Sequence, residues 1–192
     1  MAMGRTASVD EAVVQARLAE VFRAGGYAGA SLSALSAAVG LQRASLYHRF
    51  PDGKPAMARA VLQGIEAELQ ETLRPLHAEP DVAEGVAEMA RRIARGYQDG
   101  RVACVLDTMT LTGAPDDITA HAARLARQWL AAMADASLRA GADPQQANAR
   151  AQAALVRIQG ALVVSRVLHD PSVFEQTLTE LPALLLSDRR AL

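Results

Sequence analysis

A run of polar side chains between residues 42 and 48 has the types and spacing needed to hydrogen-bond nucleic acid. Arg43 can donate to guanine or to a phosphate, and the small Ala44 beside it allows close approach. Tyr47 and His48 follow one turn later, where a phenol and an imidazole can reach phosphates. The candidate contacts in this run are Gln42, Arg43, Ala44, Ser45, Tyr47 and His48.

Two further candidates flank this run. Ser31 stands where a short helix begins and can cap its first backbone N–H groups. Lys54 stands at the start of a later helix, where its ammonium and a backbone N–H could hold one phosphate together. Both are therefore counted as candidate DNA contacts.

These side chains need two short helices to position them. The first begins after Ser31, with Leu35 and Val39 facing inward, and Gly40 ends it. The second covers about residues 43–50 and turns Leu46 inward. Two short helices joined by a tight turn form a helix-turn-helix, which presents its second helix to the DNA major groove.

The rest of the chain also reads as helical, because β-branched residues are sparse and no long stretch alternates with period two. We therefore predict an all-α protein, in which a three-helix DNA-binding head at residues 1–53 joins a larger helical body at residues 54–192. The helices outside the helix-turn-helix are expected at about residues 9–24, 55–74, 82–97, 102–111, 115–140, 144–169 and 171–186.

Composition excludes several classes of protein. The 192 residues contain one cysteine, Cys104, which rules out a disulfide scaffold. No apolar run approaches the ~20 residues needed to span a bilayer, and no signal peptide is visible, so a cytoplasmic protein without a membrane partner is expected. Residues 1–60 carry seven basic and four acidic groups, whereas the remainder is net acidic. A basic head on an acidic body weakly favours a nucleic-acid-facing end.

The stretch from Val14 to Leu62 resembles the DNA-binding domain of TetR-type transcriptional regulators. The turn at residues 50–54, Phe-Pro-Asp-Gly-Lys, is similar to that of the LmrA/YxaF-like branch. The other matching residues are Phe22, Gly26-Tyr27, Ser31-Leu32, Leu35, Ala38, Gly40-Leu41 and Ser45-Leu46-Tyr47-His48-Arg49-Phe50. Departures from the family pattern are Ser36, Gln42, Arg43, Ala44, Pro55 and Ala56, and they bear on the operator sequence more than on DNA binding.

The resemblance implies that residues 54–192 form a ligand-binding and dimerisation domain with a small-molecule pocket among its middle helices. No metal and no cofactor are expected. Methionine adapts to irregular shapes, and tyrosine and tryptophan each combine an apolar ring with one polar group. Residues of these types at helical spacing would equally suit a plain core. The candidate ligand-binding residues are Met89, Ile93, Tyr97, Cys104, Met109, Trp129 and Met133. Arg157 and Gln159 could orient a polar ligand or lie at an interface, and a sensing role for Cys104 is left open.

Apolar stripes in the last two expected helices suggest a homodimer. One stripe contains Leu155, Ile158, Leu162, Val163 and Val167, and Gly160 within it permits close helix approach. The other contains Phe174, Leu178, Leu181 and Leu184-Leu185-Leu186. Two such stripes suit a four-helix bundle made by two subunits. A dimer would also place two recognition helices about 34 Å apart, as an inverted-repeat operator requires.

We therefore expect a ligand-responsive transcriptional regulator, and specifically a repressor that binds double-stranded DNA as a dimer and is released by a small apolar effector. The alternative is a small-molecule sensor or carrier that acts through a protein partner. An enzyme is not expected, because the sequence has no phosphate loop, no GxSxG elbow and no HExxH or clustered metal ligands. The sequence does not identify the effector, the operator or the regulated genes.

Overall fold

The computed structural model describes residues 10–186, which form ten helices and no strand. The predicted all-α class is therefore confirmed. The helices are α1 (Glu11–Gly29), α2 (Leu32–Val39), α3 (Arg43–Arg49), α4 (Lys54–Leu73), α5 (Pro75–Ala78), α6 (Val82–Gly96), α7 (Val105–Thr110), α8 (Asp116–Arg139), α9 (Pro144–Leu168) and α10 (Ser172–Leu186).

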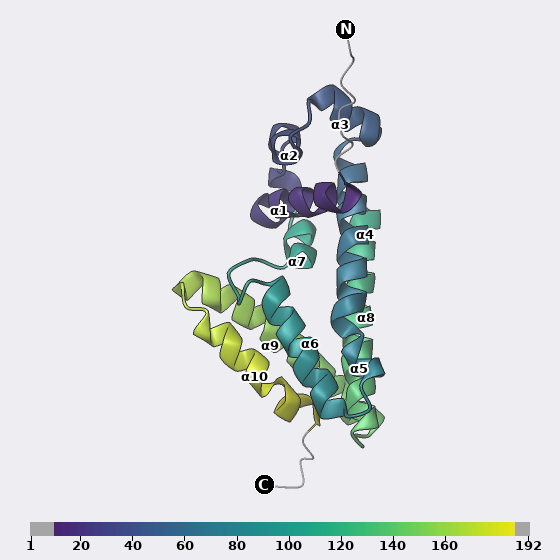
Figure 1. Cartoon of the computed structure of the whole chain (residues 1–192), viewed down its shortest axis with the longest axis vertical. Coiled ribbons are helices and arrows are strands. Elements are labelled where there is room, and N and C mark those ends of the chain that lie inside the picture. The colour runs from purple at the N-terminus through teal and green to yellow at the C-terminus, as the bar shows by residue number, and fades with distance from the viewer. Residues whose placement is uncertain (1–9, 187–192) are drawn as a thin grey trace.

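The molecule is elongated, with a small head at one end of a larger helical body (Figure 1). Helices α1, α2 and α3 form the head, and α4 runs from the head along the length of the body beside α8. Helices α6, α9 and α10 pack on the other side of the body. The short α7 lies between α1 and the body, so the head touches the body through both α4 and α7.

Local capping explains why the head helices begin and end where they do. The Ser31 hydroxyl accepts a hydrogen bond from the Ala34 N–H at 3.1 Å, which caps α2 as predicted. Gly40 ends α2 in the left-handed conformation at φ 68°. Gly26 interrupts α1 at φ 62°, and the helix resumes for a few residues beyond it. The helix expected to end near residue 24 is thus kinked at Gly26 and ends at Gly29.

The turn of the helix-turn-helix is held from both sides. The Ser36 hydroxyl donates to the Leu41 carbonyl across the turn, which gives this departure from the family pattern a structural role. Below the turn, Leu35, Val39 and Leu46 are almost completely buried. These side chains fix the angle at which α3 leaves the head.

The body follows the expected pattern with two differences. Pro75 ends α4 but also begins the extra short helix α5, because proline suits the first turn of a helix. Helix α7 is shorter than expected and starts only at Val105, because the chain turns sharply through Gln98, Asp99 and Gly100, all at positive φ. A Cβ on Gly100 would lie 2.7 Å from the Phe174 Cβ, so this turn also packs tightly against α10.

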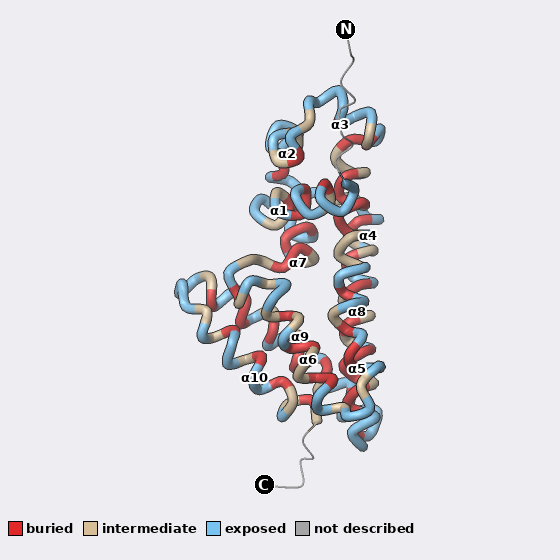
Figure 2. The backbone as a smooth tube through the Cα atoms, in the orientation of Figure 1, coloured by how far each residue is buried: buried red, intermediate tan, exposed pale blue. Residues whose placement is uncertain are grey.

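The expected interface stripes are mostly buried inside the chain, which corrects the sequence interpretation. Ile158 and Leu162 of α9, and Phe174 and Leu178 of α10, form part of the core because α10 packs along α9 and α6. Only Val163 and Val167 of the expected stripes are exposed, and the end of α9 nearest the start of α10 is drawn in the pale blue of exposed residues (Figure 2). These two belong to an exposed apolar stripe of α9 whose members are Val156, Val163, Val164, Val167 and Leu168, with the exposed Gly160 among them. We call this stripe the α9 face.

Helix α9 is also, within residues 10–186, the one helix long and apolar enough to cross a bilayer by length and composition. The sequence analysis expected no apolar segment of that length, and α9 is an exception to that expectation. Core helices of soluble proteins meet the same two criteria, and 33% of the most apolar window of α9 is buried inside the protein.

Candidate functional site

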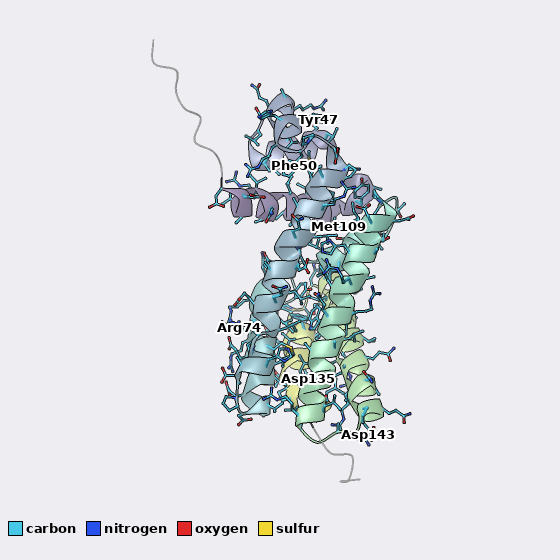
Figure 3. All side chains as sticks on the ribbon, turned by 90° about the vertical axis from the view of Figure 1, so that its right-hand side faces the viewer. Tyr47, Phe50, Arg74, Met109, Asp135 and Asp143 are labelled. Carbon is cyan, nitrogen blue, oxygen red and sulfur yellow. The ribbon has the colours of Figure 1, made fainter. Side chains whose placement is uncertain are left out.

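The predicted DNA contacts lie together on the outer surface of α3, at the tip of the head. Gln42, Arg43, Ala44, Ser45, Tyr47 and His48 are all exposed. Leu46, in the middle of the same run, is buried. Tyr47 projects from the head at the end farthest from the body, whereas Phe50 turns inward beneath it (Figure 3). The tyrosine ring also packs against Gly53, where a Cβ would lie 3.3 Å from Tyr47 Cε1.

Ser31 and Lys54 both have partners within the head. Ser31 is exposed at the start of α2 and uses its hydroxyl to cap that helix. The Lys54 ammonium donates to the Tyr27 carbonyl at 2.9 Å and lies 4.6 Å from the centroid of the Tyr27 ring. An ammonium has three N–H donors, so two remain beyond the bond to Tyr27. A phosphate contact by either residue stays a prediction.

Two adjoining hollows lie in the body below the head. The inner cavity has a volume of about 80 Å³ and lies among α1, α4, α6, α7 and α8. The outer groove has a volume of about 700 Å³ and is bounded by α7, α8 and α9. Cys104, Leu106 and Trp129 belong to the walls of both. The inner cavity is lined by Arg23, Ile65, Glu68, Leu69, Thr72, Arg92, Ile93, Gly96, Tyr97, Cys104, Val105, Leu106 and Trp129.

The structure divides the seven predicted ligand-binding residues into two groups. Four of them line the inner cavity, namely Ile93, Tyr97, Cys104 and Trp129. Met89, Met109 and Met133 are fully buried and belong to neither wall. Met109 lies at the junction between head and body, on the level just below α1 (Figure 3). These three methionines therefore fill the core.

Several lining residues were missed by the sequence analysis. Arg23 comes from α1 and Thr72 from α4. The apolar periodicity of these two helices does not indicate that a cavity lies beside either residue. Gln159, which the sequence did single out, lines the outer groove. Arg157 does not reach either hollow, because its guanidinium lies on the exposed surface 3.8 Å from Glu180.

Polar groups of the inner cavity are arranged around Tyr97. Its hydroxyl donates to the Cys104 sulfur at 3.3 Å and also bonds with the Gln159 side chain. Burial raises the pKa of the Tyr97 hydroxyl well above its ordinary value, so it remains protonated. Two donors in the same walls have no partner within residues 10–186, the Trp129 Nε1–H and the Arg23 Nε–H.

A tight contact joins the head to the cavity through α7. The Thr108 hydroxyl donates to the Phe22 carbonyl of α1 at 3.2 Å. The kink at Gly26 brings α1 so close that a Cβ there would lie 2.7 Å from the Thr108 carbonyl oxygen. Helix α7 contributes to the walls of both hollows, so this contact links the two hollows directly to α1.

A second link ties α4 to α8 by ion pairs. Arg59 donates to Asp117 at 2.7 Å and lies 3.6 Å from Asp52 of the head. Deeper along α4, Glu66 accepts from Arg124 at 2.6 Å and bonds His121 at 3.1 Å. The Arg124 guanidinium, helped by His121, lowers the pKa of Glu66 to about 2.

Comparison with known families identifies the chain. Residues 16–61 match the profile of the bacterial regulatory proteins of the tetR family. Residues 82–180, which are more than half of the chain, match the C-terminal domain of LmrA/YxaF-like transcriptional regulators. The protein therefore belongs to the TetR family, in its LmrA/YxaF-like branch, and is a ligand-responsive transcriptional regulator. A search among curated proteins finds no significant match.

Solved structures show the same fold over nearly the whole chain. A TetR regulator from Legionella pneumophila superposes with a TM-score of 0.80 at 16% identity, covering 95% of this chain and 98% of its own. A cysteine mutant of the TetR family regulator CifR, solved with 26-bp operator DNA, has a TM-score of 0.73 at 22% identity, with coverage of 94% and 98%. The reduced form of NemR from E. coli has a TM-score of 0.73 at 17% identity, with coverage of 91% and 97%.

Proposed function

We propose that this regulator is a repressor that binds an inverted-repeat operator as a homodimer through α3. The observation that carries this proposal is the surface of α3, where six polar or small side chains are exposed around one buried leucine. That arrangement suits a helix held firmly by its inner side while its outer side reads base edges. The operator complex of CifR, which shares the fold, supports the same use of the head.

The proposed dimer forms through the α9 face. Five apolar side chains and Gly160 are exposed there at positions that repeat every three or four residues, which is one side of a helix. Pairing this face with its copy would remove it from water and set the two heads about one helical turn of DNA apart, roughly 34 Å. Such a protein acts on chromosomal DNA, so the cytoplasm is its proposed location.

The proposed effector binds beside α7. The outer groove there shares Val156, Gly160 and Val163 with the α9 face, so the second subunit of the proposed dimer would cover that groove and leave the inner cavity for the effector. Both links between body and head start beside these hollows, one through α7 and Thr108 and one through α4 and Arg59. An effector that prefers one arrangement of these links would change the spacing of the two α3 helices and so release the operator. This coupling requires different effector affinities in the two arrangements. No cofactor enters the mechanism.

Selection of bound duplexes from a randomised DNA pool tests the repressor proposal. We expect an enriched inverted repeat, and with about eight phosphate contacts the affinity should fall with salt with a slope of roughly −7. The variant R43A should weaken binding to the selected site by about tenfold or more. The matched control R127A, on the exposed surface of α8, should bind as the unchanged protein does.

Binding without enrichment would overturn the operator proposal. A small-molecule sensor acting through a protein partner would then be the better interpretation. A promoter fusion that rises rather than falls when the protein is supplied would show an activator instead of a repressor.

A further inference from the structure

A separate hollow lies in the body where α9 turns into α10. Its volume is about 420 Å³, and its walls come from α9, from the turn into α10 and from the connection between α6 and α7. The lining residues are Gly100, Arg101, Ser165, Arg166, His169 and Pro171. None of them lines the inner cavity or belongs to the α9 face. This hollow is therefore distinct from both the proposed effector cavity and the proposed dimer face.

One hydroxyl in this hollow is buried without a partner. The buried serines and threonines within residues 10–186 are Thr108, Ser137 and Ser165. Thr108 and Ser137 donate to the carbonyls of Phe22 and Leu185, at 3.2 and 2.8 Å. Ser165 is 3% exposed, and its hydroxyl has no hydrogen-bond partner in the same part of the chain. Such groups are unfavourable and rare in folded proteins, so this one indicates that a partner enters the hollow.

Basic side chains accompany this hydroxyl. Arg101, Arg166 and His169 are half of the lining residues, and none of the six is acidic. The concentration of positive groups is local, because residues 61–192 as a whole are net acidic. Within residues 10–186 Arg166 has no ion pair, and its guanidinium makes one long hydrogen bond, at 3.4 Å, to the Val102 carbonyl. Most of its donors are therefore available to a ligand.

The carboxylates next to the lining residues in sequence do not neutralise this cluster. Asp99 lies 3.4 Å from Arg101 Nη1, but both side chains are at least half exposed, and such surface pairs are weak. Arg101 Nη1 also donates to the Gln98 carbonyl, whereas Nε and Nη2 have no partner within residues 10–186. Asp170 is engaged elsewhere, because it accepts from the Ser172 N–H at 2.9 Å and so begins α10.

The donor set fits a phosphate group. Arg101 belongs to the connection between α6 and α7, whereas Arg166 and His169 belong to the end of α9, so the donors come from two segments far apart in sequence. A phosphate has oxygens in several directions and up to two negative charges, and guanidinium groups pair well with both. A carboxylate offers two oxygens in one plane and a single charge. The Ser165 hydroxyl can donate to a further phosphate oxygen.

We propose that this hollow is a phosphate-binding site, in which Arg101, Arg166 and His169 hold the anion and the Ser165 hydroxyl donates to one of its oxygens. The turn between α9 and α10 lies at the side of the body remote from α4 and from the tip of α3 (Figure 1). The phosphate is therefore not one from operator DNA bound at α3. It is either the free ion or a group on a small organic molecule. This site goes beyond the proposed repressor function and does not depend on it.

Titration of the ¹⁵N-labelled full chain with three anions tests the proposal. The probes are inorganic phosphate, glycerol 2-phosphate and acetate, each added at an ionic strength held constant with sodium chloride in a buffer free of phosphate. We expect both phosphates to shift the Gly100 and Ser165 amide resonances and to bind about tenfold or more tightly than acetate. Tighter binding of glycerol 2-phosphate identifies an organic phosphate, and otherwise the free ion is the ligand.

Two variants separate binding from folding. R101Q changes an exposed side chain and should weaken phosphate binding by about tenfold, while the control R127Q, on the exposed surface of α8, should not. S165A should also weaken phosphate binding. In the absence of phosphate it should not lower the midpoint temperature of unfolding, because it removes a hydroxyl that has no partner within residues 10–186. S137A, which breaks the bond to the Leu185 carbonyl, should lower that temperature.

Three results would overturn the phosphate site. Acetate could bind as tightly as the phosphates, which would show attraction to positive charge alone. Phosphate affinity could be unchanged in both R101Q and S165A, which would place the bound ion elsewhere. Finally, neither phosphate could shift the Gly100 and Ser165 resonances at about 10 mM, a concentration well above the dissociation constant expected of a site with several charged hydrogen bonds.

Discussion

The head and the body of this protein are both helical, but different interactions determine their functional surfaces. In the head, the bounds of the short helix α2, which precedes α3, are set by local devices, namely the Ser31 cap and the left-handed Gly40. The proposed DNA-binding surface is then the side of α3 that faces away from a small core. In the body, the helices are long and the functional space is the volume that their packing leaves unfilled. The exposed side of α3 depends on residues that are close in sequence, whereas the inner cavity depends on side chains from five helices.

Truncation of a buried methionine tests most strongly whether core and cavity in the body are correctly separated. Met109 is fully buried at the junction and lines neither hollow, so M109A should lower the free energy of unfolding by about 3 kcal/mol. Leu106, on the same helix, already faces both hollows and is only partly buried. We expect L106A to cost about 1 kcal/mol. Urea unfolding of both variants measures the difference, and equal losses would place Leu106 in the core.

A substitution at the junction between head and body should lower the free energy of unfolding almost as much. The variant G26A forces alanine into φ 62° and puts its Cβ 2.7 Å from the Thr108 carbonyl oxygen, so we expect a loss of about 2 kcal/mol and weaker operator binding. Gly29, three residues on, has nothing within 4 Å of an added Cβ and is the matched control. Thermal unfolding of G26A and G29A compares them directly. If G26A unfolded at the same midpoint temperature as the unchanged protein, α1 and α7 would not be tightly packed against each other.

The ion pairs between α4 and α8 should contribute least, and their contribution should depend on pH. The pKa of Glu66 is held at about 2, below its ordinary value of 4.5, so this stabilisation is fully present above about pH 4.5 and is lost as pH falls toward 2. We expect E66Q to cost about 1 kcal/mol at neutral pH, because the partners are partly exposed. The difference from the unchanged protein should shrink on acidification.

Glu68 on the same helix provides the control for this measurement. It is exposed and forms no ion pair with residues 10–186, so E68Q should follow the unchanged protein at every pH. A gap between E66Q and the unchanged protein that stays constant from pH 5 to pH 2 would contradict the proposed link.

The same contrast explains how much the sequence could predict. Caps, glycine turns and prolines act within a few residues, so the order of the long helices and the exposed side of α3 followed from them. The cavity could not be predicted from such local signals, because its walls combine Arg23 of the head with Trp129 of α8. Apolar periodicity shows that Met89 and Ile93 point inward. It cannot show which of the two packs against other core side chains and which lines a cavity. For the same reason it could not tell that α10 would cover Ile158 and leave Val167 exposed.

The composition of the α9 face has a consequence for the thermodynamics of subunit association. Four of its five exposed apolar side chains are valines, namely Val156, Val163, Val164 and Val167. A valine in a helix already occupies one strongly preferred rotamer, so burying it against a second subunit sacrifices little side-chain entropy. Gly160, in the middle of the face, has no rotamer to lose and lets the facing helix come near. This surface is therefore largely ordered before the proposed second subunit binds, so the loss of side-chain entropy offsets little of the free energy gained by burying its apolar area.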